Sequence, residues 1–172
     1  MLKAIGLFLI LIGGAGSGYA FSTQLSSRYA QLKELQRMTA LLIGEISYGN
    51  TPLPEGLAQV GKRLNEPFAG FLKELSEELK KKPQETLEEL FAKHVKTDLK
   101  HSCLKPGDLE ALLRMSSSLG YLDRDMQLRN LRLYETEVQQ EITDTYASMP
   151  GKKKMYQTLG IMGGLFLVIL LI

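Results

Sequence analysis

Apolar residues follow two different patterns along this chain. At both ends they form continuous runs, and neither residues 4–21 nor residues 155–172 contain a charged side chain. Between these runs, apolar positions recur every three or four residues, which is the spacing of one face of an α-helix. No alternation of apolar and polar residues predicts a β-strand in residues 22–154. The sequence therefore predicts an all-α protein with two apolar ends and an amphipathic middle.

Glycine and proline divide the amphipathic middle into helical segments. The predicted helices cover residues 23–47, 54–64, 66–81, 83–95, 106–120 and 123–149. None of them is expected to be stable alone in water, because helix nucleation is costly. Packed together they would bury one core, so we expect a six-helix antiparallel bundle with short connections.

The expected helix starts rest on local signals. Pro52 or Pro54 can occupy the first turn of the second helix, where a missing N–H costs nothing. Prolines at positions 83 and 106 are expected to begin the fourth and fifth helices in the same way. Asn65 and Asp123 are the expected N-caps of the third and sixth helices.

The expected core consists of the apolar residues that share one face of each helix. They are Leu32, Leu35, Met38, Leu42, Ile46, Phe68, Phe71, Leu72, Leu75, Leu79, Leu87, Leu90, Phe91, Val95, Leu109, Leu112, Leu113, Met115, Leu131, Tyr134, Val138 and Ile142.

The apolar ends are interpreted as membrane helices, because about 20 apolar residues cross a bilayer core. The expected domains are a transmembrane helix at 1–21, a helical bundle at 22–154 and a transmembrane helix at 155–172. Lysines 152–154 precede the second run, and Arg28, Lys33 and Arg37 follow the first. Basic residues near spans stay in the cytoplasm, so the bundle is expected to be cytoplasmic and both termini to face outward.

An alternative for the first run is a cleaved signal peptide. Lys3 would form its basic region and Ala15 with Ser17 its cleavage site. The protein would then be an exported domain anchored at its C-terminus, which the three lysines oppose.

Glycines within the two runs indicate close helix packing. Gly14 and Gly18 form one GxxxG spacing, and Gly160 and Gly164 form a second. Small residues at this spacing let helices approach closely in lipid.

Charge and cysteine content exclude several classes of protein. The net charge of +2 is too small to indicate a nucleic-acid partner. The single cysteine, Cys103, excludes an internal disulfide framework.

No catalytic residue, cofactor site or metal site is expected. The sequence has no phosphate-binding loop and no nucleophile elbow. His94, His101 and Cys103 lie close in sequence, but their spacing matches no standard zinc pattern. Glu45, Asp123 and Asp125 are interpreted as capping or solvated carboxylates. We therefore expect a protein that is not an enzyme.

Three short motifs carry a resemblance to a known family. They are EISYGNTPLPE at residues 45–55, LG at 119–120 followed by DRDMQ at 123–127, and KMY at 154–156 leading into LG at 159–160. With them, the chain resembles the stage III sporulation protein AB family of endospore-forming bacteria over nearly its whole length. That family is similar to the cytoplasmic six-helix domain of type II secretion F and pilus platform proteins. Those proteins carry two such domains and additional spans, whereas this chain has one domain.

The resemblance implies a membrane platform component of a secretion-like channel between mother cell and forespore. It would act during engulfment, be required for endospore formation and face the mother-cell cytoplasm. The implied partners are a secretion-type ATPase and other membrane proteins of the same operon. The resemblance does not decide whether the chain also forms a homo-oligomer. A generic inner-membrane adaptor or signalling protein is the alternative.

Two segments are the candidate partner interface, the loop at 48–55 and the turn at 119–127. Tyrosine favours interfaces, and Tyr48 and Tyr121 stand out because Tyr134 and Tyr146 fall on the stripe of the last helix. A proline-set turn and a helix cap would explain the same segments structurally. The candidate residues are Tyr48, Thr51, Pro52, Pro54, Glu55, Tyr121, Asp123, Arg124 and Gln127.

Overall fold

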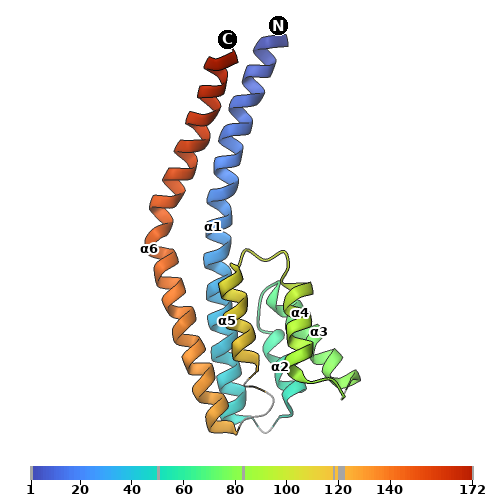
Figure 1. Ribbon diagram of the computed structural model, residues 1–172. Helices are drawn as coiled ribbons and strands as arrows, with labels where there is room; N and C mark the ends of the chain where they lie inside the picture. Colours follow the sequence, from blue (N-terminus) through green and yellow to red (C-terminus); the bar gives the residue numbers. More distant parts are fainter. Residues whose placement is uncertain (1, 50, 83, 118, 120–122, 172) are drawn as a thin grey trace. The chain divides into compact units, whose positions relative to one another are not determined.

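A computed structural model describes residues 2–49, 51–82, 84–117, 119 and 123–171 of the chain (Figure 1). In this part of the chain the secondary structure consists of six α-helices without a strand, which confirms the predicted all-helical class. The helices are α1 (Leu2–Tyr48), α2 (Leu53–Gly61), α3 (Phe68–Lys81), α4 (Leu87–Asp98), α5 (Pro106–Ser116) and α6 (Arg124–Leu171).

The chain divides into two compact units. The terminal unit consists of Met1–Tyr29 and Thr143–Ile172, and the central unit consists of Ala30–Ile142. Helices α1 and α6 contribute residues to both units, whereas α2 to α5 lie entirely in the central unit.

The core of the central unit is built from the predicted apolar stripes. Helix α2 packs on α3, α3 on α4, and α4 on α5. The rings of Phe71 and Phe91 meet edge to face with their centroids 5.1 Å apart, joining α3 to α4. Most of the expected core residues are buried, including Leu35, Met38 and Leu131. Ile46, Leu79, Leu109 and Leu113 are only partly buried.

Two predicted helix starts are confirmed. Pro54 lies in the first turn of α2, and Pro106 is the first residue of α5. The Asp108 carboxylate accepts a hydrogen bond of 2.7 Å from the backbone N–H of Lys105, which caps the start of α5.

The expected start of α3 is wrong by two residues. Asn65 is not the N-cap, because α3 begins at Phe68 and Pro67 precedes it. The backbone N–H of Asn65 instead donates a 2.7 Å hydrogen bond to Oε1 of Glu34 on α1. Asn65 therefore lies before α3, in the connection that contacts α1.

The expected start of α4 is also wrong. The helix begins at Leu87 rather than at position 83, which lies outside the described residues. Its N-cap is Thr86, whose hydroxyl accepts from the N–H of Glu89 while the Glu89 carboxylate accepts from the N–H of Thr86. This reciprocal capping box pairs two N–H groups that the helix itself leaves without partners.

The first and last helices are longer than predicted. No helix break separates the apolar ends from the amphipathic segments, and α6 continues through Pro150. A proline inside a helix removes one backbone hydrogen bond. Pro150 is exposed, so water can reach the carbonyl that loses its partner.

The predicted membrane spans at 1–21 and 155–172 are not supported by the helices of the described residues. None of these helices is both long enough and apolar enough to cross a membrane.

Candidate partner interface

The two candidate segments converge on one groove of the central unit. Thr51 from the loop after α1 lines it together with Arg124 and Gln127 from the start of α6. The groove has a volume of about 310 Å³. Its other walls are formed by Leu42, Glu45, Ile46, Gly49, Leu53, Gly56, Leu57 and Leu119. Segments that are 70 residues apart in sequence therefore share one concave surface, which we call the TPLPE groove.

Backbone contacts hold the loop at the edge of the TPLPE groove. The N–H of Gly49 donates to the Glu45 carbonyl oxygen over 2.7 Å, so the chain turns directly at the end of α1. A Cβ atom at Gly49 would collide with that same oxygen, which explains why glycine stands here. The N–H of Gly56 then donates to the carbonyl oxygen of Pro52 over 3.0 Å and starts α2.

The α6 side of the groove is tied to its surroundings by side chains. The Arg124 guanidinium donates to the carbonyl oxygen of Ser47 at the end of α1. The Gln127 amide donates to the Leu119 carbonyl oxygen over 3.1 Å. Arg124 and Gln127 therefore connect the start of α6 to the end of α1 and to Leu119 in the segment after α5.

Tyr48 is the most exposed aromatic residue near the groove in the part of the chain that the structure describes. Its side chain is 92% exposed, although aromatic rings normally bury much of their surface. Thr51, Pro52, Asp123 and Arg124 are exposed as well. Tyr121 lies outside the described residues. The exposed ring beside a concave surface is a feature of partner-binding sites, and its role in binding stays a prediction.

Two further candidate residues, Pro54 and Glu55, also have partners inside the molecule. Nζ of Lys80 on α3 lies 3.1 Å from Oε1 of Glu55, and the resulting hydrogen bond lowers the pKa of the Glu55 carboxyl. The Pro54 carbonyl oxygen accepts a 2.7 Å hydrogen bond from the buried hydroxyl of Ser76. Pro54 and Glu55 therefore attach the start of α2 to α3.

Tyr134 and Tyr146, the two tyrosines on the predicted stripe of α6, lie in different environments. Tyr134 is buried in the central unit, as the stripe predicted. Tyr146 is 63% exposed and lies in the terminal unit, where its ring is tilted against that of Tyr29 at 5.8 Å.

The glycines at GxxxG spacing contact one another within the terminal unit. A Cβ atom on Gly14 would lie 2.7 Å from the carbonyl oxygen of Gly160 and 3.0 Å from Cα of Gly164. A Cβ atom on Gly18 would lie 2.6 Å from the carbonyl oxygen of Tyr156. Neighbouring Gly13, Gly16 and Gly163 have no such contact within 4 Å. The two motifs therefore pair the N-terminal part of α1 with the C-terminal part of α6.

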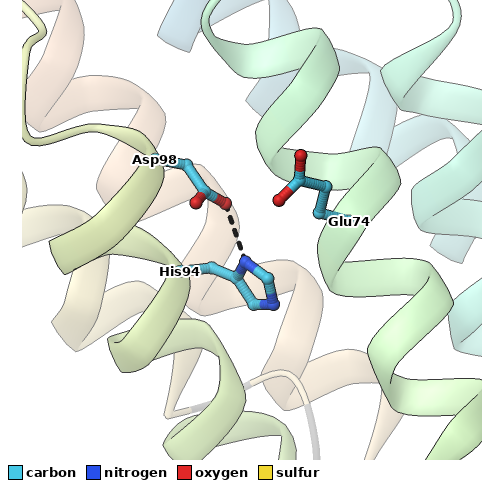
Figure 2. Close-up of side chains that lie close together, drawn as sticks. All are labelled: Glu74, His94 and Asp98. Atoms are coloured by element: carbon cyan, nitrogen blue, oxygen red, sulfur yellow. Dashed lines mark hydrogen bonds and ion pairs between the residues drawn. The ribbon is translucent and has the colours of Figure 1, made fainter.

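A polar cluster between α3 and α4 was not recognised in the sequence. His94 is 6% exposed, and Figure 2 shows its ring facing Asp98 of the same helix and Glu74 of α3. Ring atom Nδ1 lies 2.7 Å from Oδ2 of Asp98. Ring atom Nε2 lies 2.7 Å from Oε2 of Glu78, one turn beyond Glu74 on α3.

Among the described residues, lysines pair with only one of these carboxylates, Glu78. Nζ of Lys93 lies 2.6 Å and Nζ of Lys82 lies 2.8 Å from Oε1 of Glu78. Hydrogen bonds from Lys82, then Lys93 and then His94 lower the pKa of Glu78 to about 2. Glu78 is therefore an anion at neutral pH, and its charge is matched by the lysines.

His101 and Cys103 do not join this cluster. His101 is exposed and Cys103 is half-buried in the connection between α4 and α5, where the N–H of Cys103 donates to Gln31 over 2.7 Å. The pattern that could have revealed the cluster is the four-residue spacing of Glu74 with Glu78 and of His94 with Asp98, which places each pair on one helix face.

Comparison with known proteins assigns the chain to a class of all-helical sporulation proteins. The family model described as stage III sporulation protein AB matches residues 3–172. The chain is 27% identical over 171 residues to stage III sporulation protein AB of Bacillus subtilis (strain 168), covering 99% of each chain. A solved structure of stage III sporulation protein AB (SpoIIIAB) has a TM-score of 0.67 and 25% identity. That match covers 72% of this chain and 97% of the other.

The chain belongs to the stage III sporulation protein AB family, because the family model spans nearly all of it. The resemblance drawn from residues 45–55, 119–127 and 154–160 is thereby confirmed.

Proposed function

We propose that this protein is a non-enzymatic assembly component of a secretion-like channel complex between mother cell and forespore. The observation that carries the proposal is the family match over residues 3–172, since the family is one of stage III sporulation proteins. The convergence of its motifs at 45–55 and 119–127 on the TPLPE groove supports a role in binding.

The proposed partner of the TPLPE groove is the secretion-type ATPase implied by the resemblance. An ATPase that acts at a membrane needs a fixed docking surface, and a packed helical unit provides one. The groove combines an apolar wall with Arg124 and Gln127 and lies beside the exposed ring of Tyr48. Aromatic side chains and arginine are the residues most enriched at the centres of protein interfaces.

We further propose that the terminal unit anchors the protein to the mother-cell membrane around the forespore, with the central unit in the cytoplasm. Residues 4–21 and 155–172 carry no charge, and lysines 152–154 precede the second run. Large apolar side chains in these runs are exposed, which is unfavourable in water. They are Leu9, Ile12, Phe21, Met155, Leu159, Ile161, Met162, Leu165, Phe166, Leu167, Ile169 and Leu170.

Binding between the full chain in detergent and the ATPase tests the proposed partner. Tyr48→Ala should weaken this binding at least tenfold because it removes the exposed ring beside the groove. Thr51→Arg should do the same because it places a long charged side chain in the groove. The matched controls are Leu133→Ala and Thr136→Arg, which change exposed residues of α6 in the same unit. Equal affinity of the groove variants and the controls would contradict the proposal.

Membrane anchoring is tested by extraction of native membranes at alkaline pH. The full chain should stay in the membrane pellet together with a known integral protein. Release into the supernatant together with a peripheral marker would contradict the proposed anchor.

A further inference from the structure

The cluster between α3 and α4 contains three carboxylates, and the lysines of the described residues pair with only one of them. Lys82 and Lys93 both pair with Glu78. Among the described residues, no lysine or arginine pairs with Asp98 or Glu74, and Asp98 accepts a 2.6 Å hydrogen bond from the hydroxyl of Thr97 on its other oxygen. Two carboxylates and one ring nitrogen therefore face a common point without a lysine or arginine to balance them.

These three groups have the chemistry and spacing of metal ligands. One ligand atom from each of Glu74, His94 and Asp98 lies within 4.8 Å of the other two. Tetrahedral zinc bonds of about 2.0–2.1 Å place ligand atoms about 3.3 Å apart, so small rotations of the two carboxylates would be enough. His94 and Asp98 are fixed on successive turns of α4, and Figure 2 shows Glu74 approaching from α3.

Glu78 provides the support that a histidine ligand requires. In the tautomer whose Nε2–H donates to Glu78 over 2.7 Å, Nδ1 carries a lone pair toward Asp98, and a cation between Nδ1 and Asp98 would replace their direct 2.7 Å contact. Carboxylates that accept from the second ring nitrogen orient metal-bound histidines and increase their basicity. The two lysines in turn fix the position of the Glu78 carboxylate.

We propose that Glu74, His94 and Asp98 bind a divalent transition-metal cation, for which Zn²⁺ is the best match. A mixed set of one imidazole and two carboxylates suits Zn²⁺ better than Mg²⁺ or Ca²⁺, which prefer oxygen ligands alone. Three protein ligands leave a further position for water or for a partner's side chain. The cation would join α3 to α4 on the surface of the central unit.

Calorimetric titration of the chelator-treated full chain with Zn²⁺ tests this site. One equivalent should saturate the protein and raise its unfolding temperature. Glu74→Gln removes one ligand from an exposed position and should weaken Zn²⁺ binding at least tenfold without disturbing the core. Glu77→Gln on the same helix, which loses only an exposed pair with Lys81, should bind as the unaltered chain does.

Three further variants locate the cation. Cys103→Ser and His101→Gln should retain Zn²⁺ binding, and a Co²⁺-loaded protein should show no thiolate charge-transfer band. Glu78→Gln should weaken binding by about 10- to 100-fold, as for other supporting carboxylates of metal sites. The proposal is overturned if the unaltered chain shows no saturable Zn²⁺ binding, if Glu74→Gln binds with unchanged affinity, or if Cys103→Ser abolishes binding. In the first case, the hydrogen bonds between the His94 ring, Glu78 and Asp98 account for the cluster without a metal.

Discussion

Gly14 and Gly160 approach so closely that a Cβ atom on Gly14 would lie 2.7 Å from the carbonyl oxygen of Gly160. A Cβ atom on Gly160 would lie 2.5 Å from the carbonyl oxygen of Gly14 in turn. The two GxxxG motifs therefore bind each other within one chain. Phe21 and Tyr156 continue this contact with stacked rings whose centroids are 5.7 Å apart.

Gly160→Val should separate the two helices of the terminal unit. The added side chain meets backbone rather than flexible side-chain atoms, so we expect a loss of about 1–3 kcal/mol in unfolding free energy. Gly163→Val is the matched control, because a Cβ atom there meets nothing within 4 Å. Cysteines placed at positions 21 and 156 in a Cys103→Ser chain measure the separation by crosslinking. Equal crosslinking of both valine variants would contradict the glycine contact.

Thr86→Ala should destabilise the central unit by about 0.5–2 kcal/mol, the usual cost of losing an N-cap side chain. Its hydroxyl accepts from the N–H of Glu89, and alanine leaves that donor without its partner. Urea denaturation measures the change. Thr86→Ser keeps the hydroxyl and should recover most of the stability, whereas equal losses in both variants would show that the cap contributes little.

The stability contribution of Glu55 should depend on pH. Lys80 lowers the pKa of this carboxyl from its ordinary value of 4.5 in the folded state. The contribution is therefore fully present above the ordinary pKa and is lost as pH falls through the lowered value. Unfolding free energies of the unaltered chain and Glu55→Gln should differ at about pH 7 and converge under acid conditions, with a smaller difference in high salt.

Tyr134→Phe should leave stability unchanged or increase it by up to about 1 kcal/mol. The ring is 3% exposed, and its hydroxyl has no hydrogen-bond partner among the described residues. Removing a buried hydroxyl without a partner removes a desolvation cost. Burial also raises the pKa of Tyr134, so the group stays protonated. Tyr134→Ala, which removes the whole ring, should cost about 3–5 kcal/mol in thermal or urea unfolding, as for other large aromatic residues. A large loss in the phenylalanine variant would mean that the hydroxyl has a stabilising partner.

Helix periodicity was sufficient to predict the class and most of the core. The stripe from Leu32 to Leu42 is buried as its spacing indicated, because every third or fourth residue faces the same neighbours. Helix ends were harder to predict, since they depend on contacts from other elements. Asn65 has the right residue type for a cap, but α3 begins only after Pro67, and the backbone N–H and side-chain amide of Asn65 both donate to Glu34 of a distant helix.

The sequence predicted the two candidate sites to different extents. The motifs at 45–55 and 119–127 were recognised as segments, but their shared groove depends on how α1, α2 and α6 pack. The His94 cluster was missed because Glu74 and Glu78 reach it from α3, and periodicity does not specify which helices become neighbours. The four-residue spacing of His94 and Asp98 was the available signal.

Heat-resistant spore counts test the central claim most directly. A strain that lacks the gene, without a paralogue that replaces it, would be complemented with the unaltered chain, Tyr48→Ala, Thr51→Arg or the controls Leu133→Ala and Thr136→Arg. The account predicts that deletion collapses spore yield with small or distorted forespores after engulfment. It also predicts that the controls restore sporulation while the groove variants, present at equal levels, do not. Normal sporulation without the gene would contradict the channel role, and full rescue by the groove variants would contradict the proposed docking surface.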